Sequence, residues 1–427
     1  MGNTKKLMAG SGEKVQYLVR DFNDNTVRFV LHYSGRIHSD ILRDATKMIV
    51  GSVDVLHSSF HTTDSEMYWT VHEDYDEDDY FQILETQDDP FEKACDLSLC
   101  SIEPKDKTQL RCYLVRRMTE SVVVLLISHL CVDGRDGKYL LEKLVEAYNE
   151  ILENGSANKI SVKNGSRLAE QIYENVNKKD YRSLLKNPIS KIKSEFPYPS
   201  KAKGYPNMVQ ANIPKTIMEK VDGFAKLHSV TTNDVLLAAC YYAYASLPGK
   251  NALEPMSILS MMDLRRHCDG GDSAGLCNMT GAFQTILPIG LRESFSSTLI
   301  HIAEQTKAMK NNPLAGLEGM PFLHGAARNL PVKILLPIAK KLYGSFSVGL
   351  TNLGNIESRV LQLGNLEPCM GLFGGPLKKK PGMQISVVSI GGNCTLCIVG
   401  EYTDEDALLL QYMLDKIAEE VQMHALF

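Results

Sequence analysis

The sequence lacks several features that each mark a class of protein. Its formal net charge is -5 at pH 7, so it has no excess of positive charge with which to bind nucleic acid. No apolar run approaches the ~20 residues that a helix needs to cross a bilayer. A Gly-x-Ser-x-Gly segment, which carries the serine nucleophile of the α/β-hydrolases, is also absent. We therefore expect a soluble protein with no nucleic-acid partner, no membrane span and no serine nucleophile of that type.

The ten cysteines form no pattern of disulfides or of metal ligands. They lie scattered, several in apolar surroundings, and no signal peptide precedes them, which favours reduced thiols and a cytoplasmic location. Cys394 and Cys397 form a CxxC pair in an alternating apolar run, where strand geometry points their sulfurs to opposite faces. Because no second pair completes a zinc site, we expect no bound metal.

The length of 427 residues suggests two or three domains, at ~150 residues per domain. Hydrophobic residues make up 44% and charged residues 23%, which is typical of a soluble globular protein. Four prolines between residues 187 and 206, interspersed with lysines, mark the best candidate for an interdomain linker. We place an N-terminal domain at 1–190, the linker at 191–207 and a C-terminal domain at 208–427.

The strongest local pattern surrounds His129. Residues 122–128 are apolar and largely β-branched, as in a strand buried on both faces. His129 follows directly, and Asp133 and Gly134 lie in the turn before a helix with apolar residues at i, i+3 and i+4. This pattern holds His129 rigidly at a strand end, where Gly134 allows a sharp turn or a close approach of substrate.

Periodicity predicts alternating strands and helices along the rest of the chain. Residues 27–33 alternate apolar and polar side chains, as in a half-buried strand, and Asp136 is the expected N-cap of the helix after His129. Gly155 follows the expected end of that helix. The other expected strands are 67–72, 81–84, 110–118, 209–213, 257–264, 346–354, 383–390 and 394–401. The other expected helices are 39–56, 167–185, 214–225, 231–245, 297–309, 331–342 and 404–417.

The pattern His129-x-x-x-Asp133-Gly134 resembles the HxxxDG segment of the CoA-dependent acyltransferase superfamily. That group includes chloramphenicol acetyltransferase, the condensation domains of nonribosomal peptide synthetases and the alcohol acyltransferases. Further segments resemble those of the family and follow in the same order, at residues 229–239, 263–266, 278–288 and 346–354. The resemblance implies an α/β (α+β) fold with two chloramphenicol acetyltransferase-like subdomains. Each would be a mixed β-sheet flanked by helices, with the active-site tunnel between them.

The resemblance also implies acyl transfer from a thioester to an alcohol or amine. His129 would be the general base that takes the acceptor's proton, while Asp133 orients the loop and Gly134 leaves room for the reacting groups. By the same resemblance Thr351 and Asn352 are candidate substrate contacts, and Ser389 is a weaker candidate for an oxyanion hydroxyl. No permanently bound cofactor is implied. The co-substrate would be acyl-CoA or an acyl-carrier-protein thioester, and a carrier protein is a candidate partner.

Three departures from family patterns leave alternatives open. In relatives an arginine often pairs with the motif aspartate, and one candidate source of it is the position that His57 holds here, so either Arg265 or Arg266 meets Asp133 or the pair is absent. Ser128 stands where condensation domains usually have a second histidine, and residues 371–376 differ from the Asp-Phe-Gly-Trp-Gly segment of plant acyltransferases. These features favour a free-standing acyltransferase that uses acyl-CoA. The alternatives are a free-standing condensation enzyme with a carrier-protein donor and an inactive docking platform.

Overall fold

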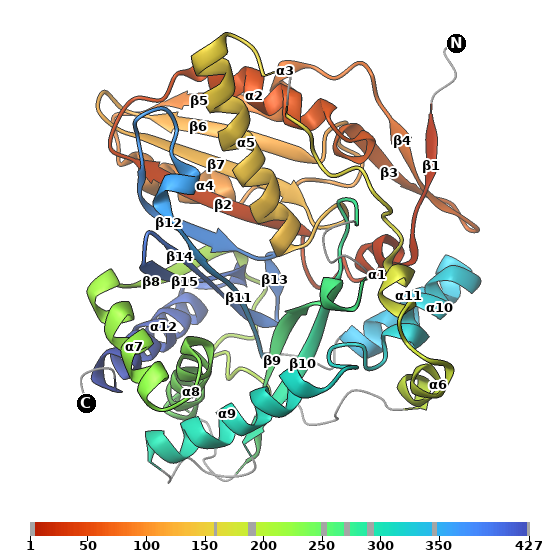
Figure 1. Cartoon of the computed structure of the whole chain (residues 1–427), viewed down its shortest axis with the longest axis vertical. Coiled ribbons are helices and arrows are strands. Elements are labelled where there is room, and N and C mark those ends of the chain that lie inside the picture. The colour runs from red at the N-terminus through yellow and green to blue at the C-terminus, as the bar shows by residue number, and fades with distance from the viewer. Residues whose placement is uncertain are drawn as a thin grey trace.

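The computed structural model describes residues 5–157, 160–186, 194–248, 254–268, 274–287, 294–343 and 348–424. Two layered halves lie one above the other, each built on a mixed β-sheet with helices packed against it (Figure 1). The expected α/β fold with two such subdomains is therefore confirmed. No helix in the described ranges is both long enough and apolar enough to cross a membrane.

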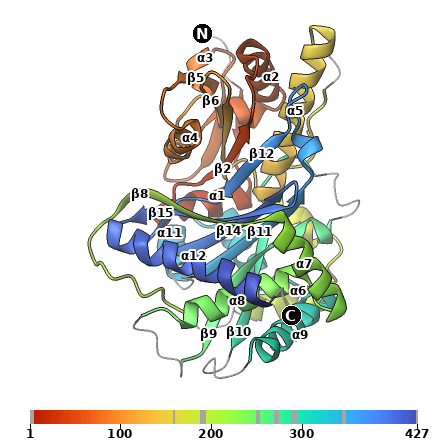
Figure 2. The same cartoon turned by 90° about the vertical axis from the view of Figure 1, so that its left-hand side faces the viewer.

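The sheet of the upper half contains the strand that ends at His129. Its order is β12-β2-β7-β6-β5, formed by Pro368–Gly374, Thr26–Tyr33, Ser121–Ser128, Leu110–Arg116 and Phe81–Glu85. Helices α2 (Ser39–Gly51) and α5 (Gly134–Asn154) share a hydrophobic core with one face of this sheet. Helix α4 (Pro90–Ser98) packs on the opposite face (Figure 2). The central strand β7 is buried along its whole length, as the apolar run predicts.

A small second sheet and several helices complete the upper half and its border. The small sheet has the order β1-β4-β3, formed by Lys6–Met8, Met67–Val71 and Ser58–Thr62. Near it lie α1 (Ser11–Leu18), the 3-10 turn η1 (Asp54–His57) and α3 (Glu77–Tyr80). Along the border follow η2 (Ala169–Tyr173), α6 (Lys178–Lys186), α10 (Met320–Asn329) and α11 (Val332–Tyr343).

The sheet of the lower half carries the remaining strands. Its order is β10-β9-β11-β14-β15-β13, formed by Thr280–Leu287, Met256–Asp263, Val348–Ile356, Met383–Ile390, Asn393–Tyr402 and Lys378–Lys379. Strand β8 (Tyr205–Ile213) also pairs with β15. Helices α7 (Lys215–Leu227), α8 (Thr232–Ala245) and α12 (Asp404–His424) share its main core, and α9 (Phe295–Asn311) packs beside α8. The 3-10 turns η3 (Leu264–His267) and η4 (Ser358–Leu361) follow β9 and β11.

Strand β12 joins the two halves. It comes late in the chain, yet it pairs in antiparallel register with β2 at the edge of the upper sheet. Its residue Leu372 lies in one hydrophobic cluster with Val30 and Val122 above and with Cys397 and Val399 below. The upper and lower sheets are thus connected by a shared core as well as by the chain.

Several expected details differ in the structure. Strand β2 is buried on both faces, because α4 covers the side that the alternation assigned to solvent. Arg28 on that side is fully buried, where it pairs with Asp24 and donates to the carbonyl of Ser98. Helix α5 begins at Gly134 with Asp133 as its N-cap, so the expected cap at Asp136 is wrong. The linker boundary stays a prediction, since residues 191–193 lie outside the described ranges.

Candidate active site

The backbone around His129 is fixed by hydrogen bonds to Asn25 and within its own turn. The amide of His129 donates to the carbonyl of Asn25 at 2.7 Å, which ties the end of β7 to the residue before β2. The amides of Cys131 and Val132 both donate to the carbonyl of Ser128, at 2.9 and 3.3 Å, and close a tight turn. The turn therefore holds the imidazole at a defined position beside the start of α5.

The contacts of the His129 ring select one tautomer. Its Nδ1 lies 2.6 Å from the carbonyl oxygen of Val132. A carbonyl oxygen only accepts hydrogen bonds, so Nδ1 carries the proton and Nε2 is left with its lone pair. The amide group of Asn278 lies 3.1 Å from Nδ1 and donates to the carbonyl of His129 at 3.4 Å. Asn278 thus reaches across from the lower half and packs against the ring.

The charge state of the ring follows from its surroundings. Burial lowers the pKa of His129 below its ordinary value of 6.5, and the hydrogen bond to Val132 opposes that effect only in part. The imidazole is therefore neutral at pH 7. A neutral imidazole with a free Nε2 is the form that can accept a proton.

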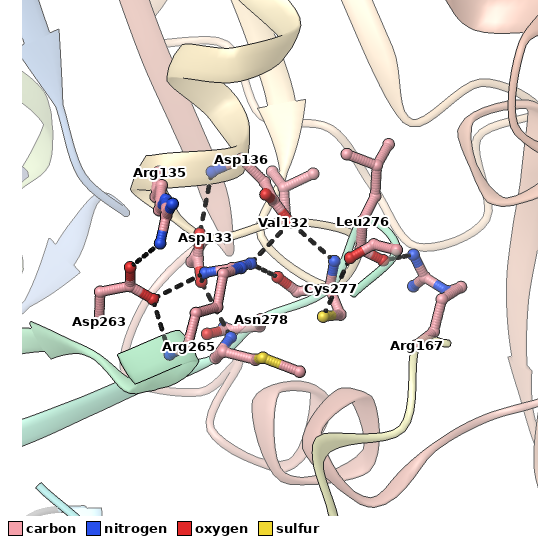
Figure 3. A network of polar contacts seen from close by, with 12 residues as sticks. Val132, Asp133, Arg135, Asp136, Arg167, Asp263, Arg265, Leu276, Cys277 and Asn278 are labelled. Atoms are coloured by element: carbon pink, nitrogen blue, oxygen red, sulfur yellow. Dashed lines mark hydrogen bonds and ion pairs between the residues drawn. The ribbon is translucent and has the colours of Figure 1, made fainter. Parts of the chain in front are cut away.

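Asp133 points into a buried ion network (Figure 3). Its Oδ1 accepts from the amide of Asp136 at 3.0 Å, which caps α5. Its Oδ2 accepts from Arg265 Nη1 at 2.7 Å and from the amide of Met279 at 2.9 Å. The alternative left open by the sequence is thereby resolved: Arg265 pairs with Asp133. The guanidinium of Arg266 instead donates to the carbonyl of Lys310.

His57 contacts a different part of the chain. Its Nδ1 lies 2.7 Å from the carbonyl oxygen of His72, and its side chain is buried. It thus fastens the loop after α2 to the end of β4, and Arg265 supplies the cation from the other half of the molecule.

A second carboxylate shares the guanidinium of Arg265. Asp136 Oδ2 accepts from Arg265 Nη2 at 2.7 Å and from the amide of Cys277 at 2.9 Å. Burial and the neighbouring charge of Asp133 raise the pKa of Asp136 to about 6. Burial alone would lower the pKa of Arg265, but Asp133 and Asp136 raise it above its ordinary value. The network therefore links the start of α5 to η3 and the segment before β10.

Gly134 lies against side chains of β11 and β12. A Cβ added there would come within 3.0 Å of Leu353 Cδ2 and 3.4 Å of Phe373 Cζ. The absence of a side chain at Gly134 thus lets β11 and β12 approach the first turn of α5. These neighbours are protein groups, and whether substrate also approaches Gly134 stays a prediction.

The three candidates in the lower half divide between two places. Asn352 and Ser389 line a cavity of about 850 Å³ between the start of α8, β11, β14 and η4. Asn352 Nδ2 donates to Asn233 Oδ1 at 3.2 Å, which connects β11 to α8. Thr351 pairs in register with Ser386 of β14 and, like His129, Asp133 and Gly134, is not among the described residues that line this cavity.

Sequence reasoning overlooked two groups that contact His129 and its loop. The carbonyl of Val132 has no side-chain signal, because any residue can supply it. Asn278 lies in the segment 278–288, which resembles a family segment. Its side-chain amide contacts the His129 ring from the lower half of the molecule. Asp136 was expected only as a helix cap, although an aspartate three residues after another at a helix start is also placed to share a cation with it.

A family model described as "Condensation domain" matches residues 23–318, more than half of the chain. A search of curated protein sequences gives no significant match. The comparison with solved structures gives 199 significant matches, and the three described next are 12–16% identical to this chain.

Three of these structures show the kinds of protein that share the fold. The trichothecene 15-O-acetyltransferase of Fusarium sporotrichioides is 12% identical with a TM-score of 0.71, covering 98% of this chain and 95% of its own. The first condensation domain of the CDA synthetase is 14% identical with a TM-score of 0.70, covering 99% and 97%. Polyketide synthase associated protein 5 from Mycobacterium tuberculosis is 16% identical with a TM-score of 0.67, covering 97% of each chain. At these identities the structures establish a shared fold.

Proposed function

The chain belongs to the condensation-domain family of the CoA-dependent acyltransferase superfamily, and on that premise we propose that it transfers an acyl group from a thioester to a hydroxyl or amine acceptor. The observation that carries the proposal is the state of His129. Its Nδ1 proton is held by the Val132 carbonyl and its ring is neutral at pH 7, so that Nε2 is available as a base.

The proposed reaction needs no covalent enzyme intermediate. Nε2 of His129 takes the proton from the acceptor as its oxygen or nitrogen attacks the thioester carbonyl. The tetrahedral intermediate then collapses, the carbon–sulfur bond breaks, and the imidazolium returns the proton to the leaving thiolate. Donors near the carbonyl would stabilise the oxyanion, and Ser389 remains the proposed hydroxyl for that task. Thr351 and Asn352 remain proposed substrate contacts.

Asp133 has a supporting role in this proposal. Its carboxylate is fully engaged with the α5 amide, the Met279 amide and Arg265, so it is not available to exchange protons with substrate. It acts by fixing the turn that carries His129 and by holding the two halves in register around that turn.

One observation supports the alternative donor, a carrier-protein thioester. Four carboxylates and two cationic side chains line the cavity that contains Asn352 and Ser389; they are Glu219, Asp222, Glu357, Glu367, Lys215 and Arg359. Arg359 is already paired with Glu357. Such a lining offers no excess of positive charge to the several phosphates of CoA. A phosphopantetheine arm on a carrier protein, with one phosphodiester, fits this charge balance better.

The decisive experiment measures thiol release from a panel of acyl-CoAs and from an acylated carrier protein, with pooled alcohol and amine acceptors. We expect acceptor-dependent release that falls by at least about 100-fold in His129→Ala, the lower end of what a positioned general base contributes. His228→Ala, at the exposed histidine that follows α7 as its C-cap, is the matched control and should retain full activity.

The outcomes separate the three candidate functions. Release from acyl-CoA that depends on His129 supports the acyl-CoA transferase, and release only from the carrier protein supports the condensation enzyme. Equal rates in the protein and in His129→Ala would rule out the proposed base. Tight binding of a thioester with no turnover under any condition would leave the docking platform.

A further inference from the structure

Three side-chain amides from distant parts of the chain meet beside His129. Gln16 belongs to α1, Asn25 precedes β2, and Asn278 precedes β10. Helix α1 lies at the border between the two halves (Figure 1). Gln16 contacts both of the other two side chains, so the three amides form one connected group around His129.

The orientation of the Asn278 amide is set by its own hydrogen bonds. Its Oδ1 accepts from the backbone amide of Thr280 at 3.1 Å. Its Nδ2 donates to the backbone carbonyl of His129 at 3.4 Å and to Gln16 Oε1 at 3.5 Å. These two acceptors account for both hydrogens of the nitrogen. The NH2 group therefore faces His129, because a flip would bring the side-chain oxygen against two other oxygens.

This orientation places a nitrogen, and not an oxygen, against the ring. Asn278 Nδ2 lies 3.1 Å from His129 Nδ1, whose own proton points to the carbonyl of Val132. The partial positive charge of the NH2 group opposes a positive charge on the imidazole, whereas an oxygen in the same place would stabilise one. The contact with Asn278 therefore acts in the same direction as burial, which lowers the pKa of His129.

Gln16 supports both this contact and the backbone of the same turn. Gln16 Nε2 donates to Asn25 Oδ1 at 2.6 Å, and Asn25 Nδ2 donates back to the carbonyl of Gln16 at 3.1 Å. The carbonyl of Asn25 in turn accepts from the amide of His129 at 2.7 Å. Asn25 has a φ of 52°, in the left-handed region that asparagine tolerates better than most residues. Gln16 is thus tied to the ring of His129 through Asn278 and to its backbone through Asn25.

Charged groups of both signs lie near His129. Asp133 raises the pKa of His129 and Lys378 of β13 lowers it, both by less than burial does. On the side of α1, Glu13 pairs with Arg167. Because the nearby charges oppose each other, one added charge next to Nδ1 should shift the balance between the neutral and the protonated ring.

We propose that Asn278 and Gln16 are positioning residues for His129, and that together they hold the imidazole in the orientation and tautomer that leave Nε2 free. This inference rests on the acyl transfer proposed above, in which Nε2 is the base. Neither residue acts on the reacting atoms themselves. Asn278 contacts the ring at its other nitrogen, and Gln16 acts through Asn278 and Asn25.

The first test observes the ring directly and needs no substrate. In protein labelled with 15N-histidine, long-range 1H–15N correlation spectra show which ring nitrogen carries the proton, and His129→Ala identifies the signals. We expect His129 to be neutral at pH 7 with its proton on Nδ1. His57 is an internal standard, because its Nδ1 also contacts a backbone carbonyl, at 2.7 Å, but lies outside the group of amides.

Three variants change the amide that faces the ring or its support. Asn278→Asp keeps the size of the side chain and puts a carboxylate oxygen beside Nδ1, so the titration midpoint of His129 should rise by about one unit or more. Asn278→Ala removes the contact, and we expect signals of the tautomer with its proton on Nε2 to appear. Gln16→Ala should give the same change to a smaller extent. The signals of His57 should stay in place in all three variants.

The second test measures acyl transfer in the same variants, with the donors and acceptors used for His129→Ala. Loss of orientation should lower kcat of Asn278→Ala about 10- to 100-fold and leave KM nearly unchanged. Asn278→Asp should lose activity at pH 7 and recover it as the pH rises, because its base stays protonated to a higher pH. Asn149→Ala is the matched control and should keep full activity. The amide of Asn149 also bridges distant segments, but near the other end of α5.

The outcomes separate this inference from the proposed function. The expected ring changes without turnover of any thioester would support the positioning role and contradict acyl transfer. An unchanged tautomer and titration midpoint in both Asn278 variants would overturn the positioning role, whatever their activity. Equal losses of activity in Asn278→Ala and Asn149→Ala would overturn it too. Circular dichroism verifies that each variant is folded, and Asn278→Asp alone decides the question if Asn278→Ala does not fold.

Discussion

His129 and Asp133 are separated by one turn of chain, yet their side chains serve different ends. The imidazole keeps a free nitrogen because a backbone carbonyl, and no carboxylate, holds its Nδ1 proton. The carboxylate of Asp133 is used instead to cap α5 and to bind Arg265. A neutral hydrogen-bond acceptor at Nδ1 favours an uncharged imidazole at neutral pH more than an aspartate would.

The first prediction at this scale concerns the pH dependence of acyl transfer. Because burial lowers the pKa of His129 below its ordinary value of 6.5, the ring is mainly neutral at pH 7 and becomes protonated at acidic pH. We expect kcat/KM to be nearly constant between about pH 7 and pH 8 and to approach a tenfold fall per unit at acidic pH. A steady-state pH profile measures this. An inflection above pH 7 would contradict the assignment of the free base to His129.

The helix α5 shows how an element's ends are determined by single residues. Its last residue, Asn154, is followed by Gly155 with φ of 73°, the left-handed conformation that ends many helices. A Cβ at Gly155 would meet no atom within 4 Å, so the backbone angle alone makes glycine preferable there.

We therefore predict that Gly155→Ala lowers the free energy of unfolding by about 1 kcal/mol, the cost of the left-handed conformation for a residue with a side chain. The matched control is Gly223→Ala, in the interior of α7, where an added Cβ also meets nothing and φ is not positive. That change should stabilise the protein by about 0.5–1 kcal/mol. Urea denaturation measures both, and a loss of stability in both variants would refute the explanation.

Elements with a strong local pattern could be predicted from the sequence. The apolar run before His129 predicted β7, and the helical spacing after it predicted α5. The expected hairpin of β6 with β7 is also present. The N-cap of α5 was predicted at Asp136 and not at Asp133, because aspartate is equally suitable as a cap at either position. The burial of Arg28 could not be predicted, because Asp24 and the carbonyls of Ser98 and Gly375 satisfy it only in the folded chain.

The candidate site was predictable to a similar degree. His129, Asp133 and Gly134 were found because they are close in sequence and follow a strand. The partner of Asp133 was left open, because Arg265 lies 132 residues away and only the tertiary fold chooses it over Arg266. Asn278 was overlooked for the same reason, since its contact with His129 spans 149 residues.

At the scale of the whole molecule, the ion network around Arg265 connects the two halves, and it contains more carboxylates than guanidinium groups. Asp133, Asp136 and Asp263 contact Arg265, while Arg135 also pairs with Asp263, so three carboxylates meet two guanidinium groups. Among the described residues, the buried Oδ1 of Asp136 has no hydrogen-bond partner. A proton on Asp136 removes the excess negative charge, which agrees with its raised pKa of about 6.

This arrangement predicts how the stability of the protein depends on pH. Since the pKa of Asp136 rises from 3.8 to about 6 on folding, its proton stabilises the folded state below pH 3.8, and this contribution is lost as the pH rises to about 6. At ~1.4 kcal/mol per unit, the loss is about 3 kcal/mol. Asp136→Asn removes this titration and keeps the shape of the side chain.

The measurement is urea denaturation of the protein and of Asp136→Asn between pH 4 and pH 7. The difference in unfolding free energy between the two should move in favour of the variant as the pH increases, and should level off above pH 6. Parallel stability profiles across this range would show that Asp136 does not titrate there.

The late position of β12 in the chain bears on how the protein is made. During synthesis, β2 emerges more than three hundred residues before the strand that covers its edge. Until then the upper sheet has an open edge of unpaired backbone groups, which can pair with other nascent chains. The upper half is therefore complete only when β12 has left the ribosome, and its yield in the cell should depend on chaperones that shield that edge in the interval.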